Sequence, residues 1–102
     1  MSGKAALFVA VAEVELQFPG ARSLKDKRQD LRSIIERLRH RLQVLVVESD
    51  FQDLHQRAGL AIASLASDAE AARGTVERAL DVVNESGLGL VLHEQVQVQQ
   101  VR

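Results

Sequence analysis

Six basic residues between positions 22 and 39 have types and spacing that suit the binding of phosphate groups. They are Arg22, Lys25, Lys27, Arg28, Arg32 and Arg39. On a helix, four of them lie between about 60° and 120° from Leu31 and form a stripe: Lys25, Arg28, Arg32 and Arg39. A basic stripe can follow a phosphate backbone, and each contact adds about one unit to the salt dependence of binding. We therefore take these residues as candidate polyanion-binding residues.

A solvated helix flank is the alternative interpretation of the same charges. Residues 22–41 hold eight basic and three acidic side chains, a local net charge of +5, whereas the rest of the chain carries −6 and the total is −1. Glu36 has the spacing to pair with Arg32 and Arg39 on a helix. The acidic remainder of the chain would also repel a polyanion.

Lys27 falls inside the apolar arc of the same helix, which is an unusual place for a lysine. We expect it either to extend its ammonium to the surface or to reach the polar stretch that follows the next strand. The charged residues of that stretch are Glu48, Asp50, Asp53, His55 and Arg57. Two interpretations stay open: a structural salt-bridge network that fixes the loop, and a polar cleft for an anion at the helix N-terminus.

Catalytic and metal-binding patterns are weak in this sequence. Asp50, Asp53 and His55 are possible ligands, but their spacing matches no familiar metal motif, and the chain has no cysteine. Nucleophile-elbow, zinc-protease and phosphate-loop motifs do not occur. We expect no enzyme activity, metal or cofactor, and a small-molecule or metal-dependent enzyme centred on these three residues is the least favoured alternative.

The length and composition are those of one soluble domain. The chain has 102 residues, of which 46% are hydrophobic and 26% charged. No apolar run is long enough to span a membrane, and the start lacks the pattern of a signal peptide. We expect a single domain over residues 1–102, located in the cytoplasm and without membrane contact.

The elements that would position these residues follow from hydrophobic periodicity. We expect a strand at 7–18, a helix at 24–41, strands at 42–49 and 57–65, a helix from Ser67 or Asp68 to Gly87, and a strand at 88–98. This order predicts an α+β, ferredoxin-like βαββαβ two-layer sandwich. Its four antiparallel strands should run in the order 4-1-3-2, with both helices on one face. The loop after residue 48 then lies at the same edge as the start of the first helix.

The predicted faces of the strands divide the apolar residues into a core and an open surface. Even-numbered residues from Phe8 to Phe18 should face the helices, and in the last strand we expect the alternating set Leu88, Leu90, Leu92, Val96 and Val98 to do so. We then expect the open face to carry Leu7, Val9, Val11, Val91 and several alanines of the strand at 57–65, which favour a homodimer or another protein partner. The chain lacks the stacking aromatic residues of an RNA-recognition module, so that mechanism is excluded.

Two segments of the sequence resemble a known family. The hexamer Ser23-Leu24-Lys25-Asp26-Lys27-Arg28, which follows Pro19-Gly20-Ala21-Arg22, and the stretch from Glu48 to Ala58 are similar to those of the YlxP-like family, small bacterial proteins of unknown function. The resemblance covers nearly the whole chain and implies a single ferredoxin-like domain. Genes of this family often lie among those for translation initiation and ribosome maturation, which implies a role near the ribosome or RNA.

Two functional hypotheses compete at this point. The first is a non-enzymatic binding protein whose partner is ribosomal RNA or a ribosomal or translation-related protein, contacted through the six basic residues. The second is a homodimeric protein-interaction module that uses the open sheet face, with the helix charges serving only solubility.

Overall fold

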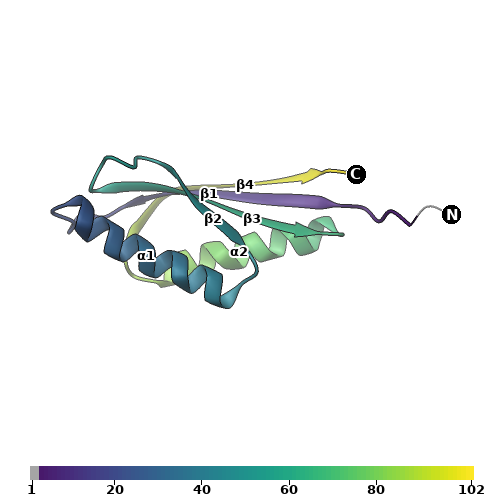
Figure 1. The fold of residues 1–102 in the computed structure, drawn as a ribbon, viewed down its shortest axis with the longest axis horizontal. Coiled ribbons are helices and arrows are strands. Elements are labelled where there is room, and N and C mark those ends of the chain that lie inside the picture. The colour runs from purple at the N-terminus through teal and green to yellow at the C-terminus, as the bar shows by residue number, and fades with distance from the viewer. Residues whose placement is uncertain (1–2) are drawn as a thin grey trace.

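The computed structural model describes residues 3–102; Met1 and Ser2, which the predicted domain includes, lie outside the described residues. Six elements follow one another along the chain (Figure 1). They are β1 (Phe8–Gln17), α1 (Leu24–Arg41), β2 (Leu45–Asp50), β3 (Arg57–Ala66), α2 (Ala69–Glu85) and β4 (Leu90–Gln100). Their order confirms the predicted order of strands and helices.

The four strands form one antiparallel sheet in the order β2-β3-β1-β4. This order is the predicted 4-1-3-2 read from the other side. Both helices pack on the same face: α2 contacts β1, β3 and β4, whereas α1 lies against β2 (Figure 1). The arrangement confirms the α+β, ferredoxin-like fold.

The core lies between the sheet and the two helices. Its buried side chains include Ala10, Ala12, Val14 and Leu16 of β1, Leu31, Ile34 and Leu38 of α1, Leu60 and Ile62 of β3, and Val76 and Val83 of α2. The even-numbered residues of β1 thus face the helices, as predicted. Because full burial of a Leu, Ile or Val side chain contributes about 1.5–3 kcal/mol, these contacts hold α1 and α2 against the sheet.

Polar caps fix where the helices begin, and a glycine follows the end of α2. The hydroxyl of Ser23 accepts a hydrogen bond from the Asp26 N–H, and the carboxylate of Asp68 accepts one from the Glu70 N–H. Gly87, just beyond the end of α2, has φ of +69°, a left-handed conformation that costs glycine little. Of the two expected starts of α2, Asp68 rather than Ser67 is the N-cap, and the C-cap is Ser86, one residue before the expected Gly87.

The face of β4 differs from the prediction because of a β-bulge. Glu15 pairs with His93 and Leu16 pairs with Val91, so Leu92 has no partner on β1. The extra residue reverses the alternation, and Val91 now packs against the core whereas Leu90 and Leu92 are exposed. The expectations that Leu90 and Leu92 face the helices and that Val91 lies on the open face were wrong, but Val96 and Val98 do face the helices.

The molecule is elongated, with extents of 59 × 22 × 18 Å. The start of α1 lies at one end of the long axis, and the first described residues and the C-terminus lie at the other (Figure 1). There the Leu7 N–H donates to the Arg102 carbonyl at 2.9 Å, and the Val101 N–H donates to the Leu7 carbonyl at 2.7 Å. Within residues 3–102, neither helix is long and apolar enough to cross a membrane.

Candidate functional site

The first turn of α1 is fixed by two hydrogen bonds between side chains and backbone. Ser23 Oγ accepts from the Asp26 N–H at 3.1 Å, and Asp26 Oδ2 accepts from the Arg22 N–H at 2.9 Å. In the usual capping box a Glu or Gln reaches the N–H of the cap residue itself. The shorter Asp26 instead reaches the preceding residue, which anchors Arg22 at the entry to the helix.

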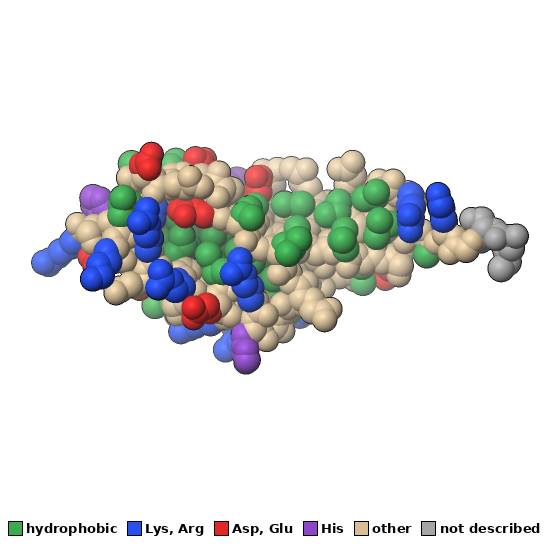
Figure 2. Space-filling view, viewed as in Figure 1, with side chains coloured by type: hydrophobic (Ala, Val, Ile, Leu, Met, Phe, Trp, Pro, Cys, Tyr) green, Lys and Arg blue, Asp and Glu red, His purple; other side chains and the backbone are tan. Residues whose placement is uncertain are grey.

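Five of the six predicted basic residues lie on the exterior and form what we call the basic surface. They are Arg22, Lys25, Arg28, Arg32 and Arg39, and all are exposed. Figure 2 shows Lys and Arg side chains gathered over α1. Arg28, Arg32 and Arg39 line a groove of about 470 Å³ whose other walls are Leu31, Ile35, Glu36 and Glu48.

The positive charges of the basic surface have no acidic partner among the described residues. Within residues 3–102, none of its five side chains forms an ion pair, so the expected pairing of Glu36 with Arg32 and Arg39 was wrong. Arg39 makes one hydrogen bond, from Nη2 to the Val46 carbonyl at 3.3 Å, which holds it across the groove toward β2. The guanidinium groups of Arg28 and Arg32 remain available to a ligand.

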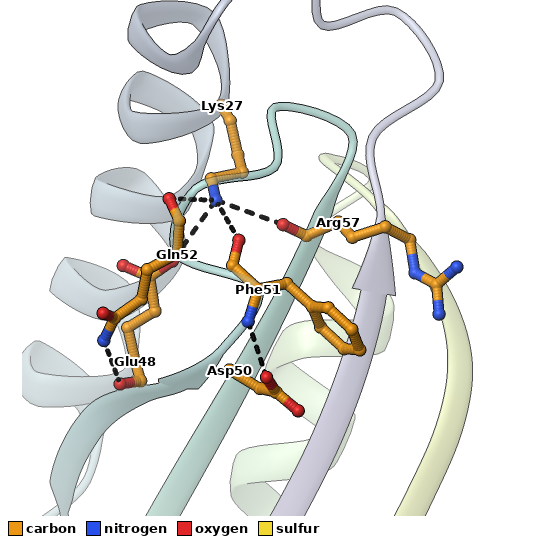
Figure 3. Close-up of polar contacts among 6 residues, drawn as sticks. All are labelled: Lys27, Glu48, Asp50, Phe51, Gln52 and Arg57. Carbon is orange, nitrogen blue, oxygen red and sulfur yellow. Dashed lines mark hydrogen bonds and ion pairs between the residues drawn. The ribbon is translucent and has the colours of Figure 1, made fainter.

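Lys27 points inward instead, and its side chain is fully buried. Its Nζ donates to the carbonyls of Phe51 at 3.0 Å, Arg57 at 3.1 Å and Gln52 at 3.3 Å, and it lies 3.4 Å from Glu48 Oε2 (Figure 3). Four acceptors surround an ammonium that has three protons. The expectation that Lys27 contacts phosphate is corrected, because its charge is enclosed by the protein.

We call residues 48–57 the Lys27 loop. They run from the end of β2 to the first residue of β3 and surround this ammonium. A second set of bonds ties it to the turn after β1. Gln56 Nε2 donates to the carbonyls of Pro19 and Ala21, and the Phe18 N–H donates to the Gln56 carbonyl at 2.8 Å. The loop is therefore attached on both sides, which favours the structural interpretation of Lys27 over an anion cleft.

Phe51, which directly follows β2, and Arg57, which begins β3, fix the two sides of the loop. Phe51 has φ of 58°, which is rare for a bulky residue, and the Asp50 carboxylate accepts a hydrogen bond from its N–H at 2.9 Å. The Arg57 guanidinium lies 5.0 Å from the centre of the Phe51 ring and forms an ion pair with Glu15 of β1. Asp50 and Arg57 thus have structural partners within the loop and the sheet.

The remaining predicted loop residues, Asp53 and His55, are exposed at the loop tip. Among residues 3–102, no three His, Asp or Glu side chains come close enough to hold a metal ion, so Asp50, Asp53 and His55 do not form a cluster. The structure also brings only Lys27 into contact with the loop; in the described chain, Lys25 and Arg28 make no hydrogen bond or ion pair with it.

Some partners had no signal in the sequence. Three of the acceptors of Lys27 are backbone carbonyls, which every residue type provides. Glu15 pairs with Arg57 across 42 positions of sequence. Only the position of Lys27 within the apolar arc of α1 indicated that its ammonium would be directed inward.

The open face of the sheet carries a second candidate surface, which we call the open-face patch. It consists of Val9 and Val11 of β1, Leu45 and Val47 of β2, and Ala61, Ala63 and Leu65 of β3, which lie side by side in the strand register. Leu45, Leu65 and Val47 are 75%, 66% and 59% exposed. The patch spans β2, β3 and β1, and it is bounded by Glu13 along β1 and by Gln95, Gln97 and Gln99 of β4.

Solved structures resemble this chain in fold. It is similar to the de novo designed protein Foldit4, with a TM-score of 0.49, 16% identity and coverage of 94% of this chain and 97% of that one. LarC2, the C-terminal domain of a cyclometallase involved in synthesis of the NPN cofactor of lactate racemase, gives a TM-score of 0.50 at 10% identity and covers 93% of this chain and 56% of its own.

A third similar structure is a C-terminal segment of the α subunit of aIF2 from Pyrococcus abyssi. It gives a TM-score of 0.48 at 16% identity, with coverage of 98% of this chain and 53% of that one. The chain thus spans about half the length of two of these structures. At such low identity the similarity concerns the fold and carries no function.

A comparison with curated proteins gave no match. The sequence profile of a family described as "Protein of unknown function (DUF503)" matches residues 9–96. This match covers both segments on which the resemblance to the YlxP-like family depends, and that label is a name for the same family. The chain therefore belongs to the DUF503 family of proteins of unknown function.

Proposed function

We propose that this protein is a non-enzymatic, cytoplasmic RNA-binding protein that contacts the phosphates of ribosomal RNA through the basic surface. The observation that carries the proposal is the exposure of five cationic side chains, four on one flank of α1 and Arg22 just before the helix, that form no ion pair within residues 3–102. Solvent-exposed cations on one helix flank are the usual electrostatic means of binding a phosphate backbone.

The buried ammonium of Lys27 supports this role indirectly. Glu48 lines the groove beside Arg28, Arg32 and Arg39, and an uncompensated carboxylate there would repel a phosphate. The Lys27 ammonium lies 3.4 Å from it and offsets its charge. Three guanidinium groups then face one remaining carboxylate in the groove, that of Glu36.

The dimensions of the groove suit a short stretch of nucleic-acid backbone. Arg28 and Arg39 are eleven residues apart on α1, which corresponds to about 16 Å along the helix axis. Ile35, which is half-buried, lies between the arginines and offers apolar contact to riboses or bases. The basic surface thus combines phosphate contacts with a partly apolar floor.

The salt dependence of binding tests this proposal. We expect a fluorescently labelled single-stranded fragment of ribosomal RNA to bind the protein at low salt, measured by fluorescence anisotropy. Each phosphate contact contributes about 0.7 to the slope of log affinity against log salt for a single strand, so Arg28→Ala/Arg32→Ala should lower the slope by about 1.4.

A matched control is Arg73→Ala/Arg78→Ala, because it removes the same charge from two exposed arginines of α2. We expect this control to keep the slope of the unchanged protein. The proposal fails if the protein does not bind the RNA at low salt, or if both double variants lower the slope equally.

A second candidate function is a homodimeric protein-interaction module, and the exposure of Leu45, Val47 and Leu65 favours it. On this proposal Val47→Lys, which places a charge in the open-face patch, converts a dimer to a monomer in sedimentation velocity. Leu54→Lys is a control, because Leu54 is also half exposed but lies at the tip of the Lys27 loop. A protein that is monomeric at all concentrations contradicts this function.

A further inference from the structure

β4 is the strand that the rest of the protein buries least. It lies at the end of the sheet opposite β2, so one side of its backbone has no strand partner within residues 3–102. None of its eleven residues is buried, although β4 pairs with β1 along its whole length. Val96 and Val98 face the helix layer but are only partly covered by it.

Beyond its bulge at Leu92, β4 lacks most of the devices that usually protect a sheet edge. Such edges are short, bulged, or marked by charged residues or proline. From His93 to Gln100 the strand pairs with β1 in unbroken register and contains no proline, lysine, arginine or glycine. Its charged side chain, that of Glu94, lies near the start of this stretch.

The opposite edge is protected in several of these ways. β2 has only six residues, carries Glu48 and Asp50, and its register shifts between these two residues. This difference between the two edges limits the assemblies that can form. Association through β4 alone stops at two copies, whereas two unprotected edges would let copies add without limit and form a fibre.

We propose that β4 pairs antiparallel with β4 of a second copy of this chain and joins the two sheets into one sheet of eight strands. A two-fold axis through Gln97 sets the register, with Val96 of one copy opposite Val98 of the other. Such an interface is isologous, so each contact occurs twice.

This register places like side chains together on each face. On the helix face, the two copies bring four valines side by side, which completes the partial cover of Val96 and Val98. On the open face, Gln97 lies opposite Gln97 of the second copy, and Gln95 lies opposite Gln99 of the second copy. Amide side chains can hydrogen-bond in such a ladder. The strand is self-complementary in both its apolar and its polar positions.

The charges of the strand do not oppose this pairing. With the axis at Gln97, Glu94 lies opposite Gln100 of the second copy, and the two Glu94 side chains are six residues apart along the strand, or about 20 Å. A second copy is therefore a better occupant of this edge than a strongly charged strand, which would find no complementary charge on residues 95–100.

The dimer has a consequence that rests on the RNA-binding function proposed above. The two-fold axis is perpendicular to the sheet, so the helices of both copies lie on the same side. The two β2 strands are seven strand spacings apart, about 33 Å, and α1 lies against each of them. The two basic surfaces therefore face the same way and can contact one RNA at two places, which raises its affinity.

Charge substitution at the axis tests the pairing without RNA. Gln97 is exposed and lies outside the core, so Gln97→Lys leaves the fold intact, which circular dichroism checks. We expect the unchanged chain to dimerise in sedimentation velocity between low micromolar and several hundred micromolar concentration. We expect Gln97→Lys and Gln97→Glu each to weaken the dimer at least about fivefold, since like charges then lie directly opposite.

Mixing the two variants is the decisive measurement, because opposite charges then meet across the axis. We expect the equimolar mixture to recover the dimer, and Gln43→Lys, an exposed glutamine outside β4, to leave it unchanged. The proposal is overturned if the chain is monomeric throughout, if the mixture does not recover, or if Val47→Lys dissociates the dimer while Gln97→Lys does not. None of these results depends on RNA binding, so the two proposals can fail separately.

Discussion

Lys27 illustrates how one side chain can organise a loop that is distant in sequence. Burial of an ammonium is expensive unless hydrogen bonds replace its water, and here four acceptors do so. Without Lys27 the carbonyls of Gln52 and Arg57 and the carboxylate of Glu48 would lose this donor, whereas the Phe51 carbonyl would still accept from the Leu54 N–H at 3.1 Å. An apolar residue at position 27 would suit the arc of α1 but would not satisfy those carbonyls.

Replacing Lys27 should therefore destabilise the protein. For Lys27→Met, which keeps the length and loses the charge, we expect the free energy of unfolding to fall by about 3 kcal/mol, since the loop carbonyls and Glu48 lose their donor. Urea unfolding measures this change.

The neighbouring exposed residue provides the control. Lys25→Met removes the same charge from the same helix turn but breaks no internal bond, so the change should stay within about 0.5 kcal/mol. Equal losses for the two variants would show that Lys27 does not fix the loop.

At the scale of elements, two bulges decide where side chains of the edge strands point. One in β2, between Glu48 and Asp50, lies beside Gly59 of β3, and the other in β4 lies at Leu92. A Cβ at Gly59 would lie 2.9 Å from Asp50 Cβ and 3.1 Å from Ser49 Oγ. The glycine lets the bulged strand approach β3 closely just before the chain enters the Lys27 loop.

We therefore expect Gly59→Ala to lower the free energy of unfolding by about 1–3 kcal/mol, as overpacked sites do. Thermal or urea unfolding measures it. Gly20→Ala is the matched control, because a Cβ there meets no atom within 4 Å and the change should be near zero. If both substitutions have the same small effect, the bulge tolerates a side chain and the close approach is unimportant.

At the scale of the whole molecule, periodicity predicted most of the fold. The apolar stripe of α1 and the alternation in β1 gave the correct elements and faces, because each is buried on one side only. The face of β4 was not predictable, because Leu90, Val91 and Leu92 are all apolar and pairing with β1 decides which one bulges.

The candidate site was predicted only in part, for a related reason. Charge and helical spacing identified the cations of α1, and these properties belong to the side chains themselves. Which cation turns inward depends on carbonyls contributed by Phe51 and its neighbours after the sheet has formed. Sequence patterns describe side chains, and so they do not reveal a binding partner made of backbone.

The backbone bonds between Leu7 and residues 101 and 102 nearly close the chain into a ring. A short peptide linker could therefore join the two ends, and the chain could be opened instead at Gly87, which is exposed between α2 and β4. In this circular permutant β4 would precede β1, and these two paired strands would become a local hairpin. The three-dimensional structure would be kept while the most sequence-distant strand pairing became a local one.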